Sequence, residues 1–401
     1  MFRNVKIKTT PQELILEAPV DLTLQEVLRI NKLPVSLFQG YIFNTKNLEK
    51  KQIPIPLNLK IKDIDAENEI IIQCIRNTDL RQVLPQKIFY KKADGAITIL
   101  RDLNIEEKEC SETTYEINET EAKNIVAKEV EIFMEEFSRA KKIVLGISGG
   151  GDSNTLVRSL KKFSINNKNE YICFTLVFDP IWPDSGAERA SELCKENKIE
   201  HHIYNSKDIK KILKMRGKLE DFFDEFSKLF GDNTSHFFAT YIISLVARML
   251  CKKHKTDEYG LGYNREDVLA ELTFSLMNGQ KPLSFPIRNF GSIKLLMPLW
   301  KIPKKILDAC YPKYSIKNYQ ERIDKTTAQR SIIYYLAHAI EDAYYDLGLS
   351  LMVGIKKLFS GEWSKLKHDQ EYDLYLSEYA EKDKIDEVKN LLKKYFTIPI
   401  G

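Results

Sequence analysis

A short apolar run that ends in a glycine-rich loop constrains this chain more than any other feature of its sequence. The run Ile143-Val144-Leu145-Gly146-Ile147 is typical of a buried parallel strand, and Ser148-Gly149-Gly150-Gly151-Asp152-Ser153 follows it directly. A helical pattern starts at Ser153, so the loop is predicted to be a strand-to-helix turn. Glycines let the backbone approach a ligand closely, and the amides of a helix start attract anions. The loop therefore predicts a phosphate-binding site.

Asp152 makes this loop different from a simple anion site, because a carboxylate repels phosphate. A Mg²⁺ ion bound between the two removes that repulsion. Ser148 and Ser153 add hydroxyl donors without bulk. The combination predicts a magnesium–nucleotide complex held by its phosphates, with an ordinary glycine-rich turn as the alternative. The patterns G-x-x-x-x-G-K-S/T and G-x-G-x-x-G are both absent, which excludes the two commonest nucleotide loops.

Strand and helix patterns alternate after the loop, which predicts a parallel sheet with helices on both faces. Helical patterns are found at 153–162, 185–197 and 235–253, and strand patterns at 171–178, 201–204 and 259–262. The fold class predicted for this part is α/β, with a doubly wound parallel sheet. Asp179 follows one of the strands, and ligands of such sheets gather at the carboxyl ends of strands. We therefore expect Asp179 beside the adenosine of a bound nucleotide, with a simple role in the turn as the alternative.

The first 80 residues follow a different pattern, which predicts a small α+β domain. Two short strand patterns lie within 4–17, and Thr23-Leu24-Gln25-Glu26 then forms a capping box at a helix start. An apolar strand pattern at 69–75 closes the segment. This order resembles a ubiquitin-like β-grasp domain. The boundaries predicted are 1–80 for this domain, 81–117 for a connector, 118–315 for the α/β domain and 316–401 for a helical C-terminal region.

Two stretches of the α/β part resemble a known family. Residues 146–153 are similar to the SGGxDS signature of the PP-loop, or N-type, ATP pyrophosphatases, whose fold is adenine nucleotide α-hydrolase-like. In that family ATP is cut between its α and β phosphates, AMP is transferred to a carbonyl oxygen, and a sulfur or nitrogen nucleophile displaces it. Residues 261–271 look like the G-H-N/H-x-D-D-x-x-E-T motif of the branch that makes 2-thiocytidine, 2-thiouridine or lysidine in tRNA. The weaker match 297–300 corresponds to an R-P-L segment of that branch.

The resemblance, which covers about 120–315, implies the cofactors ATP and Mg²⁺ and a set of site residues. Asp152, Asp267 and Glu266 are the expected catalytic residues, and Asp152 and Asp267 the expected magnesium ligands. The residues expected to bind ATP are Ser148, Gly149, Gly150, Gly151, Asp152, Ser153, Asp179, Gly262 and Asn264.

The sequence departs from the motif of the tRNA branch at two positions. Tyr263 replaces its His, and Glu266 its first Asp. The expected substrate is a tRNA nucleobase. A free small molecule and a nucleotide-binding regulatory protein without catalysis remain as alternatives.

Charge and cysteine usage narrow the expected partners. The net charge of +4 is too small to imply a nucleic-acid partner, but 301–330 has eight Lys or Arg against three Asp or Glu. Lys301, Lys304 and Lys305 are candidate RNA phosphate contacts, or else a solvated basic helix face. The six cysteines contain no C-x-x-C, which argues against an iron–sulfur site. Sulfur or an amine is then expected from a separate donor.

No stretch of the sequence reads as a signal peptide or a transmembrane helix. We therefore expect a cytoplasmic protein that does not associate with a membrane. A homodimer is an expected assembly.

Overall fold

The structure is a computed structural model that describes most of the chain. The described residues are 1–8, 13–31, 33, 35–44, 52–74, 96–102, 111–167, 169–179, 181, 186–231, 234–312, 314–315, 328–343 and 347–400. They form two compact units that alternate along the sequence. One unit comprises Met1–Ile125, Arg265–Ala270 and Ile302–Val353, and the other Val126–Asn264, Glu271–Lys301 and Gly354–Gly401. The predicted boundaries at 80, 117 and 315 stay predictions.

The second unit is built around a six-stranded sheet, in which five strands are parallel and one edge strand is antiparallel. Its strands, in spatial order, are β10 (Glu200–Tyr204), β9 (Glu170–Leu176), β8 (Lys142–Gly146), β11 (Glu258–Leu261), β13 (Ile293–Leu296) and β12 (Ile287–Phe290). The centre of β8 is buried on both faces, which explains its continuous apolar run. This sheet confirms the predicted α/β class.

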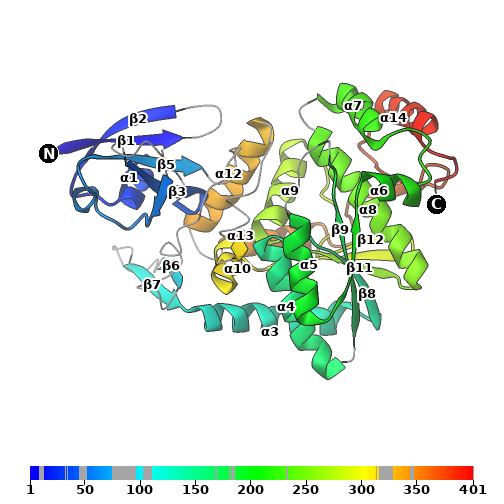
Figure 1. Ribbon diagram of the computed structural model, residues 1–401, viewed down its shortest axis with the longest axis horizontal. Coiled ribbons are helices and arrows are strands. Elements are labelled where there is room, and N and C mark those ends of the chain that lie inside the picture. Colours follow the sequence, from blue (N-terminus) through cyan, green and yellow to red (C-terminus); the bar gives the residue numbers. More distant parts are fainter. Residues whose placement is uncertain are drawn as a thin grey trace. The chain divides into compact units, whose positions relative to one another are not determined.

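Helices cover both faces of this sheet. α4 (Gly151–Asn167) and α5 (Gly186–Asn197) connect β8, β9 and β10 in one direction. The chain then returns past β8 to β11 through α6 (Ser206–Ile212), α7 (Leu219–Phe230) and α8 (Thr234–His254). Because such crossovers are right-handed, the two sets of helices must cover opposite faces, as Figure 1 shows for α5 and α8. The sheet is therefore doubly wound.

The first unit contains a five-stranded mixed sheet with one helix. The strands, in spatial order, are β2 (Glu13–Pro19), β1 (Phe2–Lys8), β5 (Asn68–Cys74), β3 (Phe38–Asn44) and β4 (Gln52–Ile55). Helix α1 (Leu24–Ile30) starts at the predicted capping box: the Thr23 hydroxyl accepts from the Glu26 amide, and the Glu26 carboxylate accepts from the Thr23 amide. The β-grasp assignment stays a proposal, which this strand order and the capped helix support.

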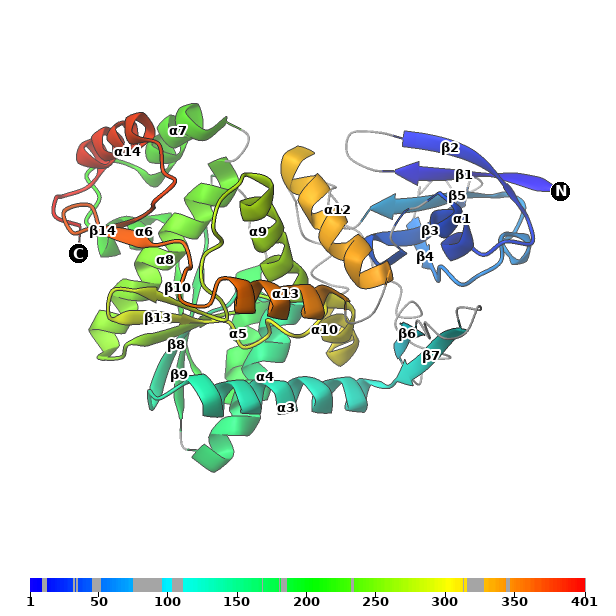
Figure 2. The same ribbon diagram turned by 180° about the vertical axis from the view of Figure 1, so that it is seen from behind.

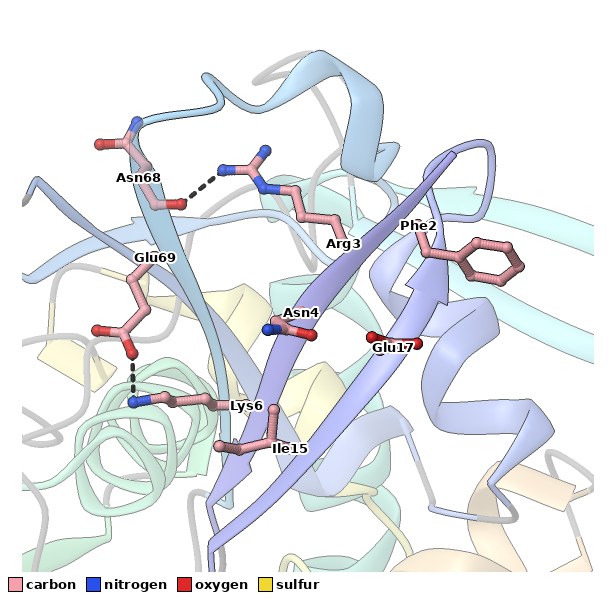
Figure 3. A pocket seen from close by; sticks show the side chains of 8 residues that line it. All are labelled: Phe2, Arg3, Asn4, Lys6, Ile15, Glu17, Asn68 and Glu69. Atoms are coloured by element: carbon pink, nitrogen blue, oxygen red, sulfur yellow. Dashed lines mark hydrogen bonds and ion pairs between the residues drawn. The ribbon is translucent and has the colours of Figure 1, made fainter.

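A cavity of about 540 Å³ lies on this sheet, lined by the eight residues labelled in Figure 3. Lys6 pairs with Glu69 there, and the Arg3 guanidinium donates to main-chain carbonyls that include that of Asn68. None of the residues predicted to bind ATP lines the cavity.

The remaining elements of the first unit follow the five-stranded sheet along the chain. Helix α12 (Ala328–Ala343) contacts η1 (Val35–Leu37), and its Tyr335 packs against the core of the N-terminal sheet. The predicted connector contains a hairpin of β6 (Ala96–Asp102) and β7 (Ser111–Ile117), and its other residues lie outside the described ones. Helix α10 (Lys304–Cys310) also belongs to this unit.

The C-terminal part of the second unit is only partly helical. A hairpin of β14 (Leu366–Asp369) and β15 (Leu374–Ser377) precedes α14 (Lys382–Tyr395), which packs against α7 (Figure 2). Among the described helices, residues of both units occur in α3 (Glu119–Phe137), α9 (Arg265–Met277) and α13 (Leu347–Leu358). Within the described residues, no helix is long and apolar enough to span a membrane.

Candidate nucleotide site

The glycine-rich loop leaves β8 and enters α4 through a backbone conformation that requires glycine. Gly149 has φ +71°, in the left-handed region that side chains disfavour. A Cβ atom built on Gly149 would lie 2.1 Å from the carbonyl oxygen of Gly186, the first residue of α5. The loop is therefore packed against the start of a second helix, and its shape depends on the absence of a side chain at this position.

The two serines hold the ends of the loop together. The Ser153 hydroxyl accepts from the Ser148 amide at 3.0 Å, and the two hydroxyl oxygens are 3.2 Å apart. The Ile147 amide donates to the Phe174 carbonyl of β9 at 3.0 Å, which extends the sheet to the edge of the loop. These contacts fix the loop at the carboxyl edge of the sheet and at the positive end of the α4 dipole.

The second motif meets the first at this edge. β11 pairs with β8, and the residues that follow β11 lie beside Asp152. The Asn264 side-chain amide donates to the Asp152 carboxylate at 3.1 Å, and a Cβ on Gly262 would lie 3.8 Å from that of Asp152. Three of the predicted site residues are thus brought together, although they come from two distant parts of the sequence. The asparagine fixes the orientation of the only carboxylate in the loop.

Two polar side chains that the motifs did not indicate support the loop from outside. Arg189 of α5 is 3% exposed and donates from Nε to the Gly149 carbonyl at 3.0 Å. Thr175 of β9 donates to the Ile147 carbonyl at 2.8 Å and lies 2.9 Å from His201 Nε2. Nothing in the local sequence signals these contacts, because Thr175 and Arg189 both lie more than 20 residues after the loop.

Asp179 lies beyond the end of β9, as the sequence predicted. Its side chain is exposed, and its main-chain carbonyl accepts from the Ser206 hydroxyl at 2.6 Å. Ser206 is the first residue of α6, so the contact ties the β9 end to the next helix. The contact with adenosine stays a prediction.

Glu266 and Asp267 lie in the first turn of α9, within the other unit. Glu266 is 2% exposed, and its two carboxylate oxygens accept from the Lys304 amide at 3.0 and 2.9 Å. Lys304 is the first residue of α10, so the Glu266 carboxylate caps that helix. Asp267 is half-buried and accepts from the Tyr334 hydroxyl at 3.1 Å. The catalytic and magnesium roles of these two residues stay predictions, and the capping role of Glu266 is one that the sequence did not indicate.

The basic segment is less solvated than the sequence suggested. Lys304 is 7% exposed, and its ammonium pairs with Asp308 at 3.0 Å, which contradicts its assignment as a solvated residue or an RNA phosphate contact. Lys301 pairs with Glu129 at 3.2 Å. The physical reason is that α10 turns its first residue toward the core, where the lysine is neutralised by a carboxylate four residues on.

A buried contact between an arginine and a glutamate lies in the same unit. Arg265 donates to Glu341 at 2.9 Å, and both side chains are almost fully buried. A Cβ on Gly348 would lie 1.8 Å from the Glu341 Oε1 atom, so a side chain there would require the Glu341 carboxyl group to move. Burial raises the pKa of Glu341 to about 8, although Arg265 acts in the opposite direction.

The raised pKa of Glu341 makes the free energy of unfolding depend on pH. An unfolded glutamate has a pKa of about 4.3, so the folded chain keeps a proton that the unfolded chain has lost. The free energy of unfolding should therefore fall as the pH rises from about 5 to about 8. Thermal unfolding across this range measures the slope, which Glu341→Gln should flatten. Glu188→Gln, at an exposed position of α5, should keep the wild-type slope. Equal slopes for Glu341→Gln and the wild type would contradict the assignment.

The parallel sheet with helices on both faces is the doubly wound α/β fold that the sequence predicted. A solved structure with this fold is that of a U34-tRNA thiolase from Methanococcus maripaludis with its 4Fe-4S cluster. It is 19% identical, covers 67% of this chain and 89% of its own, and gives a TM-score of 0.52. This likeness shows the fold. No protein-family model matches the sequence, and no curated protein matches it.

Two further solved structures are less similar to this chain. The NH3-dependent NAD synthetase from Campylobacter jejuni is 14% identical and covers 63% of this chain and 100% of its own, with a TM-score of 0.35. The C-terminal ubiquitin-like domain of mouse tubulin-specific chaperone e is 19% identical and covers 18% of this chain and 86% of its own, with a TM-score of 0.16.

Proposed function

We propose that this chain is an ATP pyrophosphatase that binds MgATP at residues 148–153 and releases AMP and pyrophosphate when it activates a substrate. The observation that carries the proposal is the loop itself. Gly149 has no room for a side chain, and the two serines of the loop hydrogen-bond to each other across it. Asn264 orients the Asp152 carboxylate. A strand-to-helix turn with only a structural role does not require these three features in combination.

The loop residues have separate tasks in this proposal. The amides at the start of α4 and the hydroxyls of Ser148 and Ser153 bind the phosphates. Asp152 is the magnesium ligand, because it is an oriented carboxylate at an anion site. When bound, Mg²⁺ neutralises charge on the phosphates. Arg189 keeps the loop in shape through the Gly149 carbonyl and acts as a positioning residue.

The substrate that we propose is a tRNA nucleobase, whose carbonyl oxygen accepts AMP and is then replaced by sulfur or an amine. The motif at 261–271 supports this choice, and the similar solved structure is named a U34-tRNA thiolase. The five described cysteines (Cys74, Cys173, Cys194, Cys251 and Cys310) are all buried. We therefore propose that sulfur comes from a separate donor. An iron–sulfur cluster is not expected, and this stays a prediction, as does a homodimer.

A free small molecule is the second candidate substrate. The buried Lys304–Asp308 pair favours it, because one of three candidate phosphate contacts is occupied within the chain. In this case the same loop performs the same chemistry without an RNA surface. The two candidates differ only in what the adenylate forms on.

One experiment tests both the reaction and the substrate. The chain is incubated with ATP and Mg²⁺, together with total tRNA or with a metabolite extract, and nucleotides and products are analysed by mass spectrometry. We expect AMP and pyrophosphate, released only when the right substrate is present. Modified nucleosides in the tRNA arm support the first candidate, and an altered metabolite supports the second. Release of ADP and phosphate would contradict the proposal in either form.

A further inference from the structure

Two histidines and a glutamate gather at the outer edge of the central sheet, apart from the residues assigned to ATP. Glu200 and His202 belong to β10, and His254 is the last residue of α8. One ligand atom from each lies within 4.8 Å of the other two. Among the described residues, no other group of three His, Cys, Asp or Glu side chains is arranged in this way.

The backbone places these side chains together. Glu200 and His202 are two residues apart on a strand and so project from the same face. Among the described strands, β10 pairs with β9 alone and so forms the edge of the six-stranded sheet. α8 ends at His254, because Lys255 takes a left-handed φ of +54° and Thr256 donates back to the Cys251 carbonyl. The helix end thus presents a histidine at a fixed place.

The hydrogen bonding of the cluster is incomplete. His202 Nε2 lies 2.7 Å from Glu200 Oε1, and the two histidine rings are 6.2 Å apart. His254 Nε2 is buried and has no hydrogen-bond partner within the described part of the chain. Such a nitrogen costs free energy unless something binds it. A cation bound between the rings would use this nitrogen as a ligand.

The donor set selects the class of cation. Two imidazole nitrogens and one carboxylate suit Zn²⁺ and related transition metals, and this set leaves a fourth position for water. Mg²⁺ prefers oxygen ligands in octahedral geometry and is disfavoured here. Ligand atoms about 2.0 Å from Zn²⁺ lie about 3.3 Å apart in a tetrahedron. Glu200 Oε1 and His202 Nε2, now 2.7 Å apart, therefore need only small side-chain rotations to reach this separation.

The electrostatic surroundings act in both directions. The carboxyl end of α8 has a partial negative charge that favours a cation, whereas Lys253 and Lys142 oppose one. The Lys142 ammonium pairs with Glu170 at 3.2 Å, and Lys253 is exposed to solvent, so both repulsions are screened.

We propose that Glu200, His202 and His254 form a binding site for a zinc-type divalent cation that ties the edge strand β10 to the end of α8. The site is independent of the proposed ATP chemistry. An edge strand has unpaired backbone groups along one side, and an ion that joins it to a helix of the same unit restrains it. The bound cation stabilises this edge of the unit.

Calorimetric titration of the full chain with Zn²⁺ tests the site, after treatment with a chelator and in the presence of excess Mg²⁺ to occupy any oxygen site. We expect one Zn²⁺ per chain and a higher unfolding temperature with the metal. His254→Gln and His202→Gln should each weaken binding by at least about tenfold, because even changes around metal ligands cost this much. Both variants should lose the metal-dependent stabilisation. Bound Co²⁺ should give the visible absorption of a low-coordinate nitrogen–oxygen site.

His368→Gln is the matched control, because His368 lies outside the cluster and pairs with Asp373 at 2.9 Å. It should bind Zn²⁺ as the wild type does. The proposal is overturned if the wild type binds no Zn²⁺, if the two cluster variants bind it unchanged, or if His368→Gln weakens binding as much as they do. These measurements report metal binding and stability alone. They therefore test the zinc site even if the protein proves to have no ATP turnover.

Discussion

Gly149→Ala should strongly weaken ATP binding while the chain stays folded. Gly149 has φ +71°, a conformation that costs alanine about 1–2 kcal/mol. The new methyl group would also lie 2.1 Å from the Gly186 carbonyl oxygen, which belongs to the backbone and cannot rotate away. The loop must therefore move, and the amides that bind phosphate move with it. We expect ATP affinity, measured by equilibrium binding, to fall by at least about 100-fold, equal to about 2.7 kcal/mol.

Gly279→Ala separates the two causes. Gly279 also has a left-handed φ, +66°, but nothing lies within 4 Å of the position that its Cβ would take. This variant should lose a little stability and keep its ATP affinity. Wild-type affinity in Gly149→Ala would show that the loop does not bind the nucleotide, and circular dichroism of both variants reports whether either has unfolded.

Asp152→Asn should stop the release of AMP and pyrophosphate and leave the fold intact. The substitution keeps the size of the side chain but removes the charge that we assign to Mg²⁺. Groups that stabilise charge in a transition state are typically worth 100-fold or more in rate, so we expect turnover to fall by at least about 100-fold. The measurement is pyrophosphate release at saturating substrate over a range of Mg²⁺ concentrations. The concentration of Mg²⁺ needed for half-maximal rate should rise in the variant.

Asp257→Asn serves as its control, because Asp257 is an exposed carboxylate of the same unit that precedes β11. It should keep the wild-type rate and magnesium dependence. Asn264→Ala should have an intermediate effect, since it keeps the Asp152 carboxylate but removes the hydrogen bond that orients it. An Asp152→Asn variant with wild-type turnover would remove this residue from the mechanism.

The sequence by itself predicted the features that depend on residues near one another in the chain. The apolar run at 143–147 and the alternation of strands and helices after it predicted the parallel sheet, because burial on both faces selects such runs. Thr23 and Glu26 predicted their capping box because its two hydrogen bonds join residues three positions apart. The loop 148–153 predicted a strand-to-helix turn, since its glycines and serines are adjacent in sequence and follow an apolar run directly.

Only the tertiary structure decided the contacts that support and surround the loop. Asn264 reaches Asp152 across 112 positions, and Arg189 reaches Gly149 across 40. The burial of Lys304 and the histidine cluster at β10 depend in the same way on how helices end and pack. A local pattern specifies which face of an element is apolar, but it does not specify which distant polar groups form hydrogen bonds with that element. These polar contacts are set by packing, because a buried polar group must find its partner wherever the fold places one.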